Sequence, residues 1–245
     1  CLIGSAGIMR QALVQAIHHA RGRRAFGKLL IDQPLMKNVL ADLALESEAA
    51  MALSMRVARA IDASTRDPME AAFARIATAI GKYQVCKRCP PMVNEAQECL
   101  GGAGYIEESI LARLYRQAPL NSIWEGSGNI QCLDVLRALR REPDTRDALA
   151  AELRSVAGEN ARLDAEAAWI GKALDEVDTL EARSRLVTER IALALQAVQL
   201  IRSAQRDSAD LFIATRLDGQ HGQHFGTLPP GTALDRLIDR AFPAM

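Results

Sequence analysis

One carboxylate in the sequence is placed where it could act as a base. Glu125 directly follows Ile123 and Trp124, and we expect these two apolar side chains to exclude part of the water from it. A carboxylate that loses water takes up a proton more readily near neutral pH, which suits a general base. The segment therefore predicts proton abstraction by Glu125.

The residues after Glu125 are typical of a tight turn and a helix start. Gly126 and Gly128 allow positive φ and a close approach of the backbone, and Ser127 or Asn129 stands where a helix N-cap would. The free N–H groups of a helix N-terminus also attract anions. A glycine-rich turn is weak evidence on its own, so these residues taken alone favour a turn and a capped helix without a site.

Two further stretches could contact phosphate groups. Residues 101–105, Gly-Gly-Ala-Gly-Tyr, could bring the backbone close to a phosphate, but no strand precedes them, so the dinucleotide-binding fingerprint does not apply. Alone they would simply end a helix. Residues 21–24 place three arginines beside Phe26, which could hold phosphate or nucleic acid, although such a run is more often a solvated turn.

Three patterns that resemble metal sites do not lead to a predicted metal. Cys86 and Cys89 have CxxC spacing, but no second pair or neighbouring histidine accompanies them. His221 and His224 fall in a glycine-rich segment without an adjacent carboxylate, and the pair at residues 18–19 would point to different helical faces. We therefore predict no metal site.

The elements that must position these residues are predicted to be helices. Hydrophobic residues make up 49% of the chain and aromatic residues only 4%, and no stretch alternates with period two for long enough to form a strand. The sequence therefore indicates an all-α protein. We expect helices over residues 5–24, 34–63, 67–100, 109–116 and 129–141, a split or kink at Pro90 and Pro91, and an extended segment over 118–122.

Beyond a boundary at residues 142–144 the pattern stays helical. We expect one or two helices over 145–174, a long helix over 179–217, a loop over 218–231 and a short helix over 233–241. The charge changes sign, because residues 1–140 hold 17 basic and 13 acidic side chains and residues 141–245 hold 13 and 17. The residues expected to face inward are Ile8, Ala12, Ile17, Ala20, Leu35, Val39, Leu43, Leu45, Met51, Met55, Val57, Val187, Ile191, Ala194, Val198 and Ile201, with Leu186, Leu193 and Leu200 as an adjacent row.

Composition excludes several classes of protein. Charged residues are 24% of the 245 with zero net charge, and no apolar run approaches the roughly 20 residues of a membrane span, so neither disorder nor a membrane protein is expected. Five scattered cysteines argue against a disulfide framework and favour a reducing, cytoplasmic compartment. Because the chain begins at Cys1 without Met or a signal-peptide pattern, we expect it to be a fragment.

Taken together, four segments resemble the C-terminal helical domain of acyl-CoA dehydrogenases in order and spacing. The resemblance covers about residues 1–140, and within that superfamily residues 1–10 and 121–137 resemble the AidB branch of adaptive-response flavoproteins, made on exposure to DNA-alkylating agents. A C-terminal extension is also typical of this branch. The four segments are Arg23–Leu30, Leu100–Tyr105, Arg113–Arg116 and Trp124–Ile130.

The resemblance implies a fold, a cofactor and an assembly. It implies a four-helix bundle over residues 1–141 and a helical extension over 142–245, with FAD held between the bundle, a middle β-domain and a second subunit of a homotetramer. The N-terminal helical domain and the middle β-domain are not in this chain, so we expect it to be a poor enzyme alone.

The resemblance also implies roles for single residues. Glu125 would remove the α-proton of an acyl-CoA thioester while the β-hydrogen leaves as hydride to the flavin. The positions that match FAD contacts are Arg23 and Phe26, toward a neighbouring subunit's cofactor, Gly101, Gly102 and Gly104, near its phosphates, and Ser127 and Asn129.

Some positions depart from the family pattern. The usual glutamine before the glycines is Glu98, which would bring a negative charge toward the FAD phosphates unless it turns away. Pro34, Cys132 and Gln117 also replace the usual residues, with Gln33 one position early. These departures weaken the case for efficient dehydrogenation more than the case for the fold.

Three functions follow as hypotheses. The first is an FAD-dependent acyl-CoA dehydrogenase. The second is a protective flavoprotein that binds double-stranded DNA, with Arg137, Arg140 and Arg141 as phosphate contacts and vestigial dehydrogenation, although the acidic extension does not favour it. The third is a helical oligomerisation module without activity of its own. None of the three involves a membrane.

Overall fold

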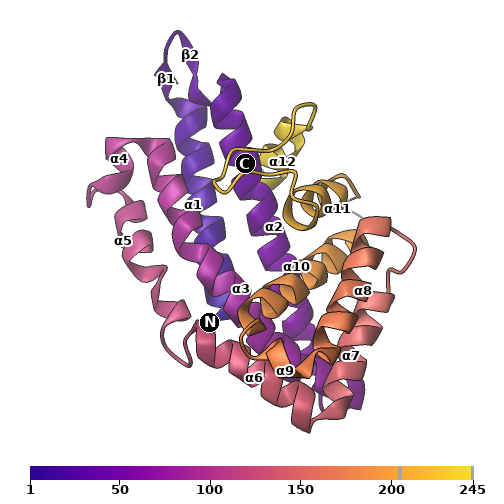
Figure 1. Cartoon of the computed structure of the whole chain (residues 1–245). Coiled ribbons are helices and arrows are strands. Elements are labelled where there is room, and N and C mark those ends of the chain that lie inside the picture. Colours follow the sequence, from indigo (N-terminus) through magenta and orange to yellow (C-terminus); the bar gives the residue numbers. More distant parts are fainter. Residues whose placement is uncertain (204–205, 244–245) are drawn as a thin grey trace.

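The computed structural model describes residues 1–203 and 206–243, and within them the chain is almost entirely helical. Its first half is built on three long helices that pack side by side, α1 (Leu2–Gly22), α2 (Pro34–Ala63) and α3 (Pro68–Leu100) (Figure 1). Smaller helices follow as α4 (Gly102–Tyr105), α5 (Ile110–Gln117), the 3-10 turn η2 (Leu120–Ser122) and α6 (Gly128–Arg141). The all-α prediction is confirmed.

Local sequence explains where the long helices begin. Pro34 is at the first position of α2, where a missing N–H leaves no hydrogen bond unmade, as expected. Asp67 caps α3, because its carboxylate accepts from the backbone N–H of Met69 at 2.9 Å. Of the split or kink expected at Pro90 and Pro91, the split is absent, since α3 continues through both to Leu100. Packing on both sides holds the helix where two backbone hydrogen bonds are missing.

A short antiparallel hairpin separates α1 from α2. Strands β1 (Arg24–Ala25) and β2 (Lys28–Leu29) pair with Ala25 opposite Lys28, which leaves a two-residue turn of Phe26 and Gly27. Both turn residues have positive φ, 51° and 84°, as the tight turn of a hairpin requires. The 3-10 turn η1 (Leu30–Asp32) then leads into α2. The hairpin projects from one end of the long helices (Figure 1).

The second half adds helices that pack onto the first. They are α7 (Pro143–Arg154), α8 (Ala161–Asp175), α9 (Val177–Leu180), α10 (Ser184–Arg202), α11 (Arg206–Phe212), the π-helical turn η3 (Ile213–Leu217) and α12 (Leu234–Ala241). The expected helix over 179–217 is therefore several elements, and part of it, residues 204–205, lies outside the described residues. The extended segment expected over 118–122 is also wrong, because η2 is helical.

A buried charged network joins the extension to the bundle. Arg56 of α2 donates to Glu152 of α7 at 2.9 Å and to Glu70 of α3 at 2.7 Å. Gln199 and Arg202 of α10 donate to the same carboxylate at 2.7 and 3.1 Å. Glu152 is 6% exposed, and these donors compensate for the water it loses, so its pKa stays below the usual value despite burial. The network fixes α7 and α10 against α2.

The loop between η3 and α12 is tied to α2 by polar contacts. Asp42, fully buried, accepts from the N–H of Gly226 at 2.8 Å and lies 2.8 Å from the ring Nε2 of His221. Asn38 exchanges two hydrogen bonds with the backbone of Leu228, both 2.9 Å. A loop with this many partners is part of the folded core of the extension rather than a free linker.

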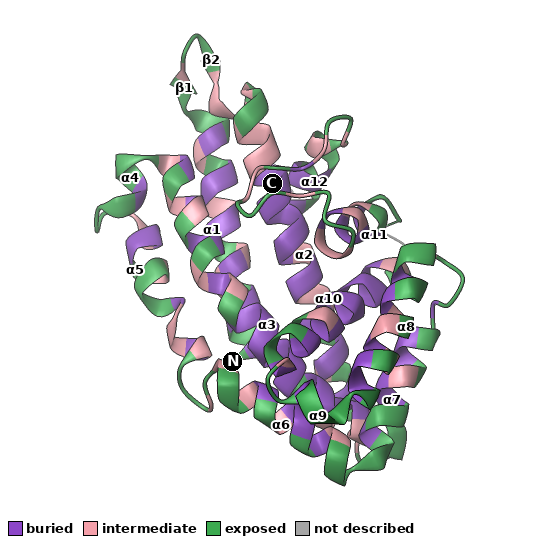
Figure 2. Ribbon diagram, viewed as in Figure 1, coloured by how far each residue is buried: buried purple, intermediate pink, exposed green. Residues whose placement is uncertain are grey.

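One hydrophobic cluster runs through both halves, and Figure 2 shows buried residues along α2 and α3 and on into α10. Most predicted inward residues lie in it or pack against it, but Leu35 and Met55 are 82% and 47% exposed and Leu186 is 50% exposed. Met55 and the buried Val57 are two positions apart, which in a helix places them on nearly opposite faces. Within the described residues, the helices are too short or too polar to cross a lipid bilayer.

Candidate functional site

The turn before α6 places Glu125 in an unusual backbone conformation. Glu125 has φ 54° and Gly126 has φ 96°, so two consecutive residues lie in the left-handed region that glycine favours. Glutamate adopts such a φ only where its surroundings hold it there. Ser127 is the N-cap of α6 but makes no side-chain cap hydrogen bond. The turn is therefore held by contacts from other residues.

Lys82 holds this turn from the middle of α3. Its Nζ donates to the carbonyl oxygen of Trp124 at 2.5 Å and to that of Gly126 at 2.7 Å, one on each side of Glu125. Gln131 adds hydrogen bonds from its Nε2 to the carbonyl oxygens of Glu125 and Gly126, at 3.0 and 3.2 Å. Lys82 is 7% exposed, and burial lowers its pKa below the usual value. Three consecutive carbonyl groups are thereby fixed while the Glu125 carboxylate stays free.

The expected shielding of Glu125 by its neighbours is absent in this structure. Ile123 and Trp124 are 64% and 50% exposed, and Glu125 is itself exposed. The indole Nε1 of Trp124 instead donates to Asn121 Oδ1 at 3.0 Å, and Asn121 donates to Ser5 Oγ of α1 at 3.1 Å. This chain therefore holds the Trp124 indole through Asn121 and does not itself desolvate the carboxylate.

The start of α6 lies next to cations from two other helices. Arg185 of α10 donates through Nη1 to Asn129 Oδ1 at 3.1 Å and through Nε to the Tyr83 hydroxyl at 3.3 Å. Lys87 of α3 lies on the same side, because a Cβ added at Gly128 would be 3.6 Å from Lys87 Nζ and 3.4 Å from the Tyr83 ring. Two positive charges beside a helix N-terminus favour an anion there.

The glycine segment after α3 is a short helix rather than only a helix end. Gly104 packs so tightly that an added Cβ would lie 2.4 Å from the carbonyl oxygen of Gln97, whose Nε2 donates to the Gly104 carbonyl at 3.0 Å. Gly101 has φ 60°, and neither it nor Gly102 has a heavy atom within 4 Å of an added Cβ. Their backbone is therefore open to a ligand.

Glu98 turns away from this glycine segment. Its carboxylate accepts a hydrogen bond from Asn94 Nδ2 at 3.0 Å, one helical turn back along α3. Side chains on a helix lean toward its N-terminus, so this contact directs the negative charge away from Gly101 and Gly102. Glu98, which replaces the glutamine usual in the family pattern, therefore does not place its carboxylate on Gly101 or Gly102.

The predicted contacts fall at two ends of the molecule. Glu125, Ser127 and Asn129 share one turn, which packs against the start of α1 through Asn121. Arg23 and Phe26 lie in the hairpin beyond the other end of α1, roughly 30 Å away along a 21-residue helix (Figure 1). Phe26 is 96% exposed at the hairpin tip. One copy of the chain does not bring the two sets together.

The arginines expected to contact DNA lie on the exposed face at the end of α6. Arg137 pairs with Asp134, which also accepts from Arg75 at 2.8 Å. Arg140 and Arg141 are exposed and form no ion pair with another described residue. Of these three arginines, Arg140 and Arg141 therefore present positive charge that no described carboxylate neutralises.

The cysteine and histidine patterns have structural partners. Cys86 and Cys89 are buried, and burial raises the pKa of Cys89 to about 12, so its thiol is not a ready metal ligand. His221 pairs with Asp42, and His18 stacks on Phe242 with ring centroids 6.5 Å apart. No cluster of three or more metal-binding side chains occurs in residues 1–203 and 206–243.

Sequence reasoning missed Lys82 and Arg185, the two side chains that organise the Glu125 turn and the start of α6. Lys82 reads as one more residue of a long amphipathic helix, and Arg185 stands in the extension, 56 positions from Asn129. Lys82 could have been found only by a search for charged residues on the buried face of a predicted helix. No local signal in the sequence points to Arg185.

Residues 1–140 match the family described as acyl-CoA dehydrogenase, C-terminal domain. The acyl-CoA dehydrogenase-family protein AidB of Escherichia coli (strain K12) is 42% identical over 222 residues, which cover 91% of this chain and 40% of AidB. Acyl-CoA dehydrogenase family member 11 of Caenorhabditis elegans is 35% identical over 138 residues, 55% of this chain and 22% of that protein.

A solved structure shows the same fold. Caenorhabditis elegans ACDH-11 in complex with C11-CoA superposes with a TM-score of 0.72 at 27% identity, over 85% of this chain and 39% of that one. The chain thus spans less than half the length of each of these relatives.

Proposed function

The chain belongs to the acyl-CoA dehydrogenase family, and we propose that it supplies the catalytic base and part of the FAD site of an AidB-like flavoprotein. In this proposal the Glu125 carboxylate takes the α-proton of an acyl-CoA thioester. Bound FAD would supply the acceptor for the hydride that leaves the β-carbon. The rest of the site comes from the parts of such a protein that this chain does not span.

The observation that carries the proposal is the fixed backbone around a free carboxylate. Lys82 binds the carbonyl groups before and after Glu125, and Gln131 binds the carbonyl group of Glu125 itself. A base must lie within hydrogen-bond reach of the proton it removes. A rigid backbone at Glu125 positions the carboxylate for this before the substrate binds. The Glu125 carboxylate is left unpaired toward solvent, where a substrate and a covering domain would meet it.

The residues present fit a group that carries phosphates. The start of α6 offers free N–H groups with the positive charge of Lys87 and Arg185 beside it, and Gly101 and Gly102, beyond the far end of α3 near the hairpin (Figure 1), offer open backbone. Ser127 and Asn129 are exposed at the same helix start. We assign FAD contacts to these residues and to Gly104, which holds the α4 turn against Gln97.

The hairpin supports a shared site between copies of the chain. Arg23 and Phe26 are exposed about one α1 length from the Glu125 turn, so they are placed to contact FAD bound by a neighbouring subunit. An exposed phenylalanine held at φ 51° on a two-residue turn is costly unless it is covered by a partner. This supports assembly as a homo-oligomer, a dimer or tetramer, with FAD at the interface.

Titration with FAD, followed by visible absorbance, tests the cofactor site. The chain and the complete product of its gene are compared, and binding by either supports the proposal. If neither binds FAD, the helical domain acts as an oligomerisation module, which size-exclusion chromatography would show as an assembly without flavin.

DNA binding is the second candidate function. It is favoured by Arg140 and Arg141, which are exposed at the end of α6 without an ion pair to a described residue. Removing a cation that neutralises a phosphate should reduce the salt dependence of binding. The double variant Arg140→Ala, Arg141→Ala should therefore bind duplex DNA more weakly with a shallower salt slope, and an unchanged slope would remove these residues from the proposal.

A further inference from the structure

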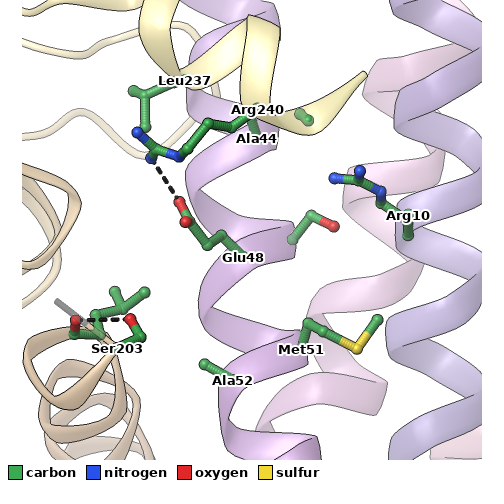
Figure 3. Close-up of a pocket in the computed structure, with 11 residues that line it drawn as sticks. Arg10, Ala44, Glu48, Met51, Ala52, Ser203, Leu237 and Arg240 are labelled. Carbon is green, nitrogen blue, oxygen red and sulfur yellow. Dashed lines mark hydrogen bonds and ion pairs between the residues drawn. The ribbon is translucent and has the colours of Figure 1, made fainter. Parts of the chain in front are cut away.

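One pocket of the molecule shares no lining residue with the Glu125 turn. It has a volume of about 480 Å³ and lies between α1, α2, the end of α10 and α12 (Figure 3). Small-molecule sites in proteins have volumes of roughly 300–1,000 Å³, so a ligand of modest size fits. The wall is mostly apolar, with Met51, Leu200 and Leu237 among its residues. Its polar groups decide what it would bind.

Arg10 is a partly buried cation that faces this pocket and has no partner among the residues that the structure describes. It lines the pocket from α1, and it forms no hydrogen bond or ion pair within residues 1–203 and 206–243. No aspartate or glutamate occurs in α1, so no neighbour on its own helix can balance the charge. In Figure 3 the guanidinium points from α1 toward the side chains of α2. A cation that has lost part of its water favours an anion beside it.

The Ser47 hydroxyl is a second donor in the same wall. The Ser47 side chain is 1% exposed and lines the pocket, yet its hydroxyl group makes no hydrogen bond with any described residue. Two donors, one of them charged, therefore open into one mostly apolar space.

The carboxylate in the pocket is already neutralised. Glu48 accepts from Arg240 at 2.9 Å and from the hydroxyl of Ser208 at 3.1 Å, and the pair lies across the pocket from Arg10 (Figure 3). The charges of Glu48 and Arg240 cancel each other, so the net charge of the pocket wall is the positive charge of Arg10. The pocket is thus complementary to a negative head group.

We propose that this pocket binds an amphiphile with an anionic head and an apolar tail of medium length. The head, a carboxylate or a phosphate monoester, accepts from the Arg10 guanidinium and the Ser47 hydroxyl. The tail lies along Met51, Leu200 and Leu237. The site is separate from the proposed FAD and acyl-CoA site and does not depend on it.

Isothermal titration of the 245-residue chain with decanoate and decyl phosphate below their micelle concentrations, and with decanol below its solubility limit, tests the proposal. Decanoate or decyl phosphate should bind, and decanol should bind at least tenfold more weakly. Arg10→Gln should weaken binding of the anion by roughly tenfold to hundredfold, the cost of a hydrogen bond to a charged group. Arg10→Lys should keep most of the affinity, and Ala52→Phe should block the pocket.

The matched control is Arg154→Gln, which removes one positive charge from the exposed face of α7. It should leave the affinity unchanged. The proposal is overturned if neither anion binds at millimolar concentration, if decanol binds as tightly as decanoate, or if Arg10→Gln and Arg154→Gln weaken binding equally. Circular dichroism confirms that each variant is folded. If Arg10→Gln does not fold, Arg10→Lys together with Ala52→Phe decides the result.

Discussion

Lys82 donates to the carbonyl oxygens on both sides of Glu125, at 2.5 and 2.7 Å, so one buried side chain of α3 fixes the backbone of the proposed base. This relationship explains how a glutamate keeps a φ of 54°. It also leaves the carboxylate itself without a partner that would compete with substrate. The turn is prepared by the helical domain, and its cover must come from elsewhere.

Replacing Lys82 with methionine should loosen the Glu125 turn. The change keeps the apolar stem but leaves the Trp124 carbonyl without a donor and the Gly126 carbonyl with Gln131 alone, a loss of about 1–3 kcal/mol in the free energy of unfolding. Hydrogen exchange at residues 124–126 should become faster, as measured by mass spectrometry. Lys172→Met, the same change at an exposed position of α8, is the control and should leave this exchange unchanged. Equal effects of the two variants would show that Lys82 does not hold the turn.

Arg185 should contribute to cofactor affinity although it belongs to the extension. Its hydrogen bonds with Asn129 and Tyr83 place a positive charge at the start of α6. In the complete gene product, Arg185→Ala should weaken FAD binding by about tenfold, whereas Arg185→Lys should retain more of it. Arg154→Ala removes the same charge from α7 and should have no effect. If Arg185→Ala does not change FAD affinity, Arg185 of the extension does not contribute to the flavin site.

Gly104 and Gly102 should differ sharply in their tolerance of alanine. A Cβ at Gly104 would lie 2.4 Å from the Gln97 carbonyl oxygen, whereas a Cβ at Gly102 meets nothing within 4 Å. Gly104→Ala should therefore cost about 1–3 kcal/mol in unfolding free energy, and Gly102→Ala should be neutral or slightly stabilising. Urea unfolding of both variants measures the difference. Two equal costs would contradict the tight packing of α4 on α3.

Acid should release the loop at residues 218–231. Burial alone would raise the pKa of Asp42, but the hydrogen bond with His221 and the charge of Arg216 outweigh it, so this pKa lies below its usual 3.8. A carboxylate with a lowered pKa stabilises the fold at pH values above 3.8, and this contribution is lost as pH falls through the pKa in the folded protein.

Limited proteolysis of the loop as a function of pH checks this prediction. Cleavage within residues 218–231 should rise steeply below about pH 4 in the native chain. Asp42→Asn should show faster cleavage at neutral pH and a shallower dependence on pH. Asp62→Asn, an exposed change on the same helix, should behave like the native chain. A native pH profile in Asp42→Asn would assign the acid response to other groups.

Local sequence signals predict where some helices begin and end. They do not predict which helices pack against one another. The expected helix over 34–63 is observed with the same ends, because proline at its first position and a long apolar stripe both mark it. The single helix expected over 179–217 is wrong, since α10 ends at Arg202. The spacing of apolar residues indicates which face of a helix is buried. It does not indicate where one helix ends and the next begins.

The site could be predicted only as far as contiguous residues allow. Glu125, Ser127 and Asn129 lie on one short segment, and the sequence was enough to single them out. Lys82 is 43 positions from Glu125, and its role depends on how α3 packs against the turn. The shielding expected from Ile123 and Trp124 is wrong for this chain, because both side chains are at least half exposed and the indole is held by Asn121, which itself contacts Ser5 of α1. Such tertiary contacts are invisible to a local pattern.

Flavin reduction by acyl-CoA in Glu125→Gln is the most direct test of the central claim. The measurement uses the FAD-loaded complete gene product under anaerobic conditions, with the bleaching of the flavin absorbance followed by stopped flow. Glutamine preserves size and backbone but cannot take a proton, so reduction should slow by roughly 10²- to 10⁴-fold while FAD affinity stays the same. Reduction at the native rate in Glu125→Gln would contradict the assignment of the base to this turn.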